Sequence, residues 1–202
     1  MNSAMSAIRS AFVGLLLSAT AVGAQPVAPP SSSFETYVEG ELIRVSIPSN
    51  WRELPGSNAV TFAPDGAFGN AGVKSVFTHG VAMGLARNDK RNLRATTDDF
   101  ITSSILFNPS PRPAARYRSV TIGDRPGLHA VLSSVSEATG EPERIGIYTT
   151  LLADGTLFYV LAVVPRDHVS AYDPTFRRVV GSIQIMDAIG PCVGEQTSRC
   201  HQ

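Results

Sequence analysis

The sequence has no excess of charge of either sign, because 17 basic and 17 acidic side chains share its 202 residues. Proteins that bind nucleic acid or anionic membranes usually carry a large basic excess, so we expect neither partner. Long apolar runs are missing as well. The run at 11–17 is followed by Ser18 and Thr20, whereas a bilayer span takes about 20 apolar residues. We therefore expect no membrane span in the mature protein.

The sequence also lacks recognisable catalytic and metal-binding motifs. It contains neither HExxH nor G-x-S-x-G, the patterns typical of zinc peptidases and of serine hydrolases. A metal site needs three or four converging ligands, and no spacing brings His79, His129, His168 and His201 together. We expect no catalytic residue, no cofactor and no metal. A triad assembled from distant residues stays open, since geometry alone could establish it.

Residues 1–24 have the pattern of a secretory signal peptide. Arg9 precedes a short apolar run, and the small residues of Val22-Gly23-Ala24 end it. This order of charge, apolar stretch and small-residue cleavage site is typical of exported proteins. We expect cleavage after Ala24 and a mature protein in the periplasm or outside the cell.

The rest of the sequence predicts one domain with a segment on either side. Residues 25–33 are rich in Pro and Ser and carry no charge, which is typical of a flexible linker. Residues 34–186 hold the regular apolar patterns and suit a single domain. Residues 187–202 form a polar C-terminal tail.

The two cysteines of the chain, Cys192 and Cys200, both lie in this tail. In an oxidising compartment, two cysteines so close in sequence predict a disulfide that closes a small loop. A metal clip formed by the two thiolates and His201 is the alternative, although their spacing is not that of a metal site.

Alternating and extended apolar patterns predict strands along most of the domain. They cover 41–47, 60–62, 73–86, 116–122, 128–137 and 144–153. Two helices interrupt them. Thr96 with Asp99 forms a capping-box pattern before a helix that Pro109 ends, and Asp173 followed by Pro174 is typical of a second helix start.

The strand expected at 156–164 determines the predicted architecture. Asp154-Gly155 before it is a strong hairpin signal. Both of its faces are apolar, one with Leu157, Tyr159, Leu161 and Val163, the other with Phe158, Val160, Ala162 and Val164. Such a strand lies inside a sheet that is covered on both sides. The sequence therefore predicts an α+β fold, a three-layer α/β/α sandwich around a mainly antiparallel sheet.

Several short motifs resemble a known family. They are Ile47-Pro48-Ser49-Asn50-Trp51, the glycine-rich run from Pro64 to Gly69, Asp154 to Tyr159 leading to Pro165, and the closing Phe176 with Ser182-Ile183. Together they resemble the PsbP-like superfamily, which includes the extrinsic subunit of photosystem II and a Ran-binding nuclear import factor. The resemblance is strongest to a secreted domain appended to some bacterial HExxH metallopeptidases. It implies an α/β/α sandwich with binding or accessory roles and no catalysis.

We therefore expect a secreted, non-catalytic binding or accessory module that acts on a protein partner in the cell envelope. Trp51, Phe68 and His79 are the candidate contact residues, although a hydrogen-bonded core position is the simplest role for His79. A carrier of a small molecule or ion, with a cleft near these three residues, is one alternative function. A hydrolase with an unrecognised active site is the other.

Overall fold

The computed structural model describes residues 27–54, 59–71, 74–87, 89–105 and 111–186. The predicted signal peptide, Cys192 and Cys200 lie outside these residues. The strands are β1 (Phe34–Glu39), β2 (Ile43–Pro48), β3 (Trp51–Leu54), β4 (Ala59–Pro64), β5 (Phe68–Ala71), β6 (Lys74–Phe77), β7 (Gly80–Ala86), β8 (Arg112–Pro113), β9 (Arg118–Ile122), β10 (Arg125–Val135), β11 (Pro142–Leu151), β12 (Leu157–Pro165) and β13 (Gln184–Ile185). The helices are α1 (Leu93–Phe100) and α2 (Val169–Gly181), with a π-helical turn η1 (Ile101–Ile105) and a 3₁₀ turn η2 (Arg166–His168).

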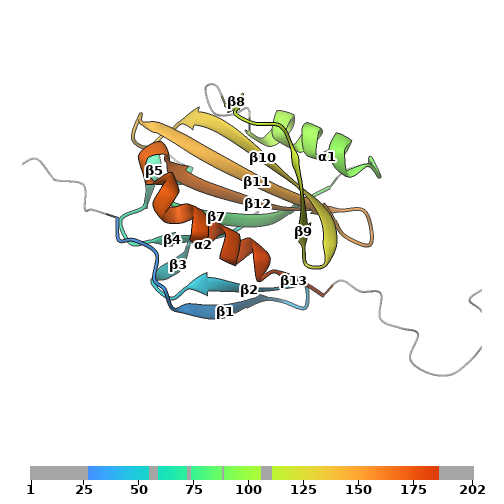
Figure 1. The fold of residues 1–202 in the computed structure, drawn as a ribbon, viewed down its shortest axis with the longest axis horizontal. Coiled ribbons are helices and arrows are strands. Elements are labelled where there is room, and N and C mark those ends of the chain that lie inside the picture. Colours follow the sequence, from blue (N-terminus) through green and yellow to red (C-terminus); the bar gives the residue numbers. More distant parts are fainter. Residues whose placement is uncertain (1–26, 55–58, 72–73, 88, 106–110, 187–202) are drawn as a thin grey trace, which may run out of the picture.

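The described strands form one large sheet and two small ones, and all pairs are antiparallel. The large sheet has eight strands in the order β3-β4-β7-β12-β11-β10-β8, with β9 also paired to β10. A three-stranded sheet has the order β1-β2-β13, and β5 and β6 form a hairpin. Figure 1 shows the small β1-β2-β13 sheet below α2, at one side of the large sheet.

The central strand of the large sheet is β12, and both of its faces are covered, as the sequence predicts. Phe158, Val160 and Val164 belong to a core that α2 and β2 complete. Leu157 and Val163 belong to a second core on the opposite face, which α1 closes. The predicted three layers are confirmed, with the small sheet sharing the outer layer of α2 (Figure 1).

The first helix begins earlier than the capping-box pattern predicts. Asn92 is the N-cap, and its side chain accepts a hydrogen bond from the Ala95 amide at 3.0 Å. Thr96, the predicted cap, is instead 1% exposed and donates its hydroxyl to the carbonyl of Lys90. The predicted start was therefore wrong, because Thr96 is buried in the core and hydrogen-bonds to the preceding loop.

The second helix also begins before its predicted start. It starts at Val169, which leaves Asp173 and Pro174 inside it. Asp173 forms an ion pair with Arg144 of β11 instead of capping the helix. Tyr172 and Phe176 are 3% and 2% exposed. The packing of this apolar face against the sheet stabilises a helix that contains a proline.

The expected run at 73–86 is two strands rather than one. It breaks at Thr78 and His79, and β7 starts at Gly80, whose φ is +140°. A β-carbon at Gly80 would lie 2.1 Å from the carbonyl oxygen of Phe62. Only glycine allows this close approach to β4. Phe68, in the glycine-rich run that precedes these strands, begins β5.

The segment predicted as a linker contacts the domain where the structure describes it. The Ser31 amide donates to the Asn50 side chain at 2.8 Å, and the Tyr172 hydroxyl donates to the Ala28 carbonyl at 3.2 Å. The domain boundaries themselves, at 24, 33 and 186, stay predictions.

Candidate functional site

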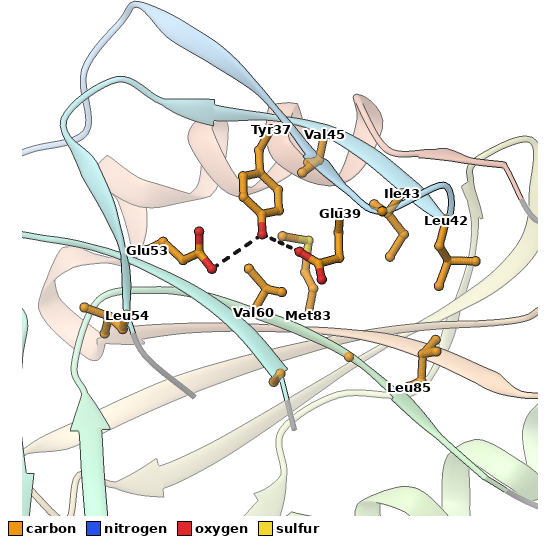
Figure 2. A pocket seen from close by; sticks show the side chains of 13 residues that line it. Tyr37, Glu39, Leu42, Ile43, Val45, Glu53, Leu54, Val60, Met83 and Leu85 are labelled. Atoms are coloured by element: carbon orange, nitrogen blue, oxygen red, sulfur yellow. Dashed lines mark hydrogen bonds between the residues drawn. The ribbon is translucent and has the colours of Figure 1, made fainter. Parts of the chain in front are cut away.

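A cleft of about 540 Å³ lies between the β1-β2 hairpin and the adjoining edge of the large sheet. Gly40, with φ +54°, turns β1 into β2 above the cleft. The opposite wall comes from β3, β4 and β7, which pair in that order. The two walls of the cleft therefore belong to different sheets. Figure 2 shows their side chains converging on the cleft from both walls.

Most of the cleft is apolar. Ile43, Val45 and Met83 form its buried base, with exposed fractions of 6%, 1% and 4%. Leu85 lies at its rim and is 46% exposed. The remaining apolar lining consists of Leu42, Leu54, Ala59 and Val60. An apolar base below an exposed leucine is the kind of surface that ligands and partners cover.

Three polar side chains meet in this apolar cleft, Tyr37 and Glu39 from β1 and Glu53 from β3. The Tyr37 ring packs edge-on against Phe62, with centroids 4.8 Å apart, and this contact orients its hydroxyl into the cleft. The hydroxyl donates to a carboxylate oxygen of Glu39 and lies 3.5 Å from Oε1 of Glu53. Figure 2 shows it between the two carboxylates.

The electrostatics of the cleft are one-sided. Its lining holds two carboxylates and no basic side chain. Neither Glu39 nor Glu53 pairs with a Lys, Arg or His within the described ranges. Burial, the hydrogen bond to Glu39 and the charge of Glu53 raise the pKa of the Tyr37 hydroxyl. The hydroxyl therefore stays protonated near neutral pH and acts as a donor, not as a base or nucleophile.

The predicted contact residues Trp51 and His79 lie elsewhere, around Tyr172 of α2. Trp51 is 6% exposed and stacks on Tyr172, with centroids 6.4 Å apart. His79 is 4% exposed, and its ring lies 5.0 Å from the same tyrosine. Its Nδ1 lies 2.9 Å from the Thr78 hydroxyl and its Nε2 lies 2.8 Å from Nδ1 of His168. These two histidines are 89 residues apart in the chain, and no sequence pattern predicts their contact.

The third candidate, Phe68, is 45% exposed on β5, where it pairs with Phe77 of β6. None of the three candidates lines either pocket that the structure describes. Their roles as ligand or partner contacts stay predictions.

Other predicted chemistry is placed as follows. His129 of β10 stacks on Tyr148 with centroids 4.2 Å apart, and burial together with Arg144 lowers its pKa. In the described part of the chain, no three His, Cys, Asp or Glu side chains gather as a metal site would require. Nor does any helix there have the length and apolarity that a membrane crossing takes.

A second pocket, of about 440 Å³, lies beside α1. Arg87, Asp89 and Asp99 line it, and Asp99 pairs with Lys90. Acidic and basic side chains neutralise one another there, so this pocket has no single electrostatic preference.

Sequence reasoning missed Tyr37, Glu39 and Glu53. Tyr37 and Glu39 lie on β1, where the half-buried positions recur every three residues. A half-buried strand is recognised in a sequence by apolar residues at every second position, and β1 lacks this pattern. The available signal was the turn residue Gly40 between two extended segments. It would have located the hairpin, though not the cleft.

Comparisons with known proteins identify the fold. The solution structure of cyanobacterial PsbP from Synechocystis matches with a TM-score of 0.54 and 9% identity, over 82% of this chain and 97% of that one. A mutant of Mog1 matches with a TM-score of 0.51 and 11% identity, over 77% and 97%. A Bacteroides thetaiotaomicron structure, of which this chain spans 48%, matches over 75% of this chain at 15% identity, with a TM-score of 0.48.

No protein-family model and no curated protein matches the sequence. The structures show that the chain has the PsbP/Mog1-like fold, as the sequence resemblance predicted. The likeness to the domain appended to metallopeptidases stays a prediction.

Proposed function

We propose that this chain is an exported, non-catalytic binding or accessory module, and that the cleft between β1-β2 and β3-β4-β7 binds a protein partner in the cell envelope. The observation that carries the proposal is the cleft itself, an open apolar surface with two unneutralised carboxylates beside it. The N-terminal signal pattern supports export. The shared fold of PsbP and Mog1 is compatible with a binding role, although fold alone does not determine function.

The chemistry of the cleft supports binding over catalysis. Its one hydroxyl belongs to Tyr37, whose raised pKa keeps it protonated. A hydroxyl and an imidazole do meet at Thr78 and His79, but neither residue lines a described pocket. A hydrolase needs its nucleophile and base where a substrate can reach them.

Site-specific photo-crosslinking tests the proposal. A photoreactive amino acid replaces Leu85, which is 46% exposed in the cleft, or Val135, which is 49% exposed on β10. We expect an envelope protein to be crosslinked from position 85 and not from 135, and to bind again when both proteins are purified. Equal labelling from both positions, or none from either, would contradict the proposal.

A small-molecule carrier is the second candidate, and the volume of the cleft favours it. A cleft of about 540 Å³ lies within the range of small-molecule sites, about 300–1,000 Å³. A ligand at a hundred times its dissociation constant adds about 2.7 kcal/mol of stability. A thermal-shift screen of metabolites should detect such a ligand, and a flat response across the screen would exclude this candidate.

A further inference from the structure

We infer that the cleft recognises a lysine or arginine side chain that an extended segment of a partner protein presents next to apolar residues. The inference rests on the proposed function, because it names the chemistry of the partner at the same cleft. Charge, shape and the free edge of β1 each contribute one step to it.

The carboxylates of the cleft provide the first step. Glu39 and Glu53 approach one hydroxyl, which has a single hydrogen to donate. Tyr37 gives that hydrogen to Glu39, and its oxygen lies at 3.5 Å from Glu53. Glu53 therefore keeps its capacity to accept hydrogen bonds, and no basic side chain lines the cleft. An occupant that supplies N–H donors and a positive charge satisfies both carboxylates, since charge-assisted bonds are the strong ones.

The apolar walls provide the second step. A bare metal ion would leave Leu42, Leu54 and Leu85 uncovered, and the described residues hold no group of three metal ligands. Lysine and arginine combine an aliphatic stem with a charged end, and such stems cover apolar surface while the charge stays at a polar site. Figure 2 shows the two carboxylates beside apolar side chains of the cleft, so a side chain of this kind suits both parts of the lining.

The strand β1 provides the third step. It pairs with β2 along one edge, and no strand of the described chain pairs with its other edge. Extended peptides add to such free edges through backbone hydrogen bonds, while alternate side chains enter neighbouring pockets. Val38 lies between Tyr37 and Glu39 on this strand and is 47% exposed. A partner strand beside β1 would cover Val38 and direct a basic side chain toward the two carboxylates.

Binding of a labelled peptide tests the inference, with fluorescence anisotropy as the readout. The probe is an extended peptide of alternating valine and lysine, and its control has norleucine in place of lysine. The variant Glu39→Gln/Glu53→Gln removes the charges of the cleft. Glu137→Gln/Glu141→Gln removes two carboxylates near the β10–β11 turn that are also exposed, and it serves as the matched control.

We expect the cleft variant to bind the lysine peptide about tenfold to a hundredfold more weakly than the wild type, because it loses charge-assisted hydrogen bonds to the lysine. The matched control should bind like the wild type. The norleucine peptide should bind weakly, and equally, to wild type and cleft variant. Circular dichroism establishes that both variants are folded.

Several results would overturn the inference. These are a norleucine peptide that binds as tightly as the lysine peptide, a cleft variant that retains wild-type affinity, and a wild type that binds neither peptide. Free butylamine that binds as tightly as the lysine peptide would show that a small cation, and not a protein segment, is recognised. If Leu85 still crosslinks a partner while the peptides fail, the proposed function stands and the inference on charge falls.

Discussion

Replacement of His79 by phenylalanine should change how the stability of the fold depends on pH. His79 is 4% exposed, and burial, with the nearby His168 as a second cause, lowers its pKa from 6.5 to about 4. Between these two pH values the unfolded chain binds a proton at this position and the folded chain does not. The contribution of neutral His79 to the free energy of unfolding is therefore fully present above pH 6.5, and it is lost as the pH falls toward 4.

The size of this loss follows from the pKa values. Since a tenfold change in proton affinity corresponds to about 1.4 kcal/mol, the lowered pKa of His79 accounts for up to about 3 kcal/mol at pH 4. The variant His79→Phe lacks this contribution. At pH 7.5 it loses two hydrogen bonds, about 1 kcal/mol each, and Thr78 keeps its contact with the Ala67 carbonyl.

Urea unfolding between pH 7.5 and 4.5 measures the effect. We expect the stability difference between wild type and His79→Phe to shrink by about 2 kcal/mol or more over this range. Thr78→Val is the control, because it removes a partner of His79 and leaves the imidazole in place. Its curve should run parallel to that of the wild type. If the curve of His79→Phe also runs parallel, the imidazole titrates normally and the assigned burial is wrong.

Three further changes test the fold by urea unfolding. Burial raises the pKa of Glu143, so its charged form destabilises the fold at pH 7. Glu143→Gln should therefore stabilise the fold at pH 7, and this gain should vanish below pH 4.5, where Glu143 is protonated in both states. An unchanged urea midpoint at pH 7 would count against this. Gly80→Ala should cost about 3 kcal/mol or more, because its β-carbon meets the Phe62 carbonyl. Gly155→Ala is the control, because Gly155 also has a positive φ, +88°, but its β-carbon meets nothing within 4 Å. It should show only the backbone strain, about 1–2 kcal/mol, and losses equal to those of Gly80→Ala would refute the steric argument. Phe158→Ala should cost about 3–5 kcal/mol, since this ring is fully buried, and a loss below 1 kcal/mol would place it at the surface.

The architecture could be predicted from the sequence because one local pattern determines it. The nine residues of β12 are apolar on both faces up to the closing Pro165, and only a sheet covered on both sides accommodates such a strand. The helix starts could not be predicted in the same way. Threonine and aspartate are residue types that often cap helices, but Thr96 is buried in the core and Asp173 forms an ion pair with Arg144. Both contacts are tertiary, so no local pattern reveals them.

The candidate site escaped prediction for a related reason. Rare residue types such as Trp51 and His79 attract attention in a sequence, yet both are buried against Tyr172 and line neither described pocket. Glu39 and Glu53 are two of 17 acidic residues, and nothing in their neighbours separates them from the others. What distinguishes them is that β1 and β3 bring them to one hydroxyl in an apolar cleft without a cation. A missing counter-charge is a property of the folded chain, because it depends on which residues the sheets keep apart.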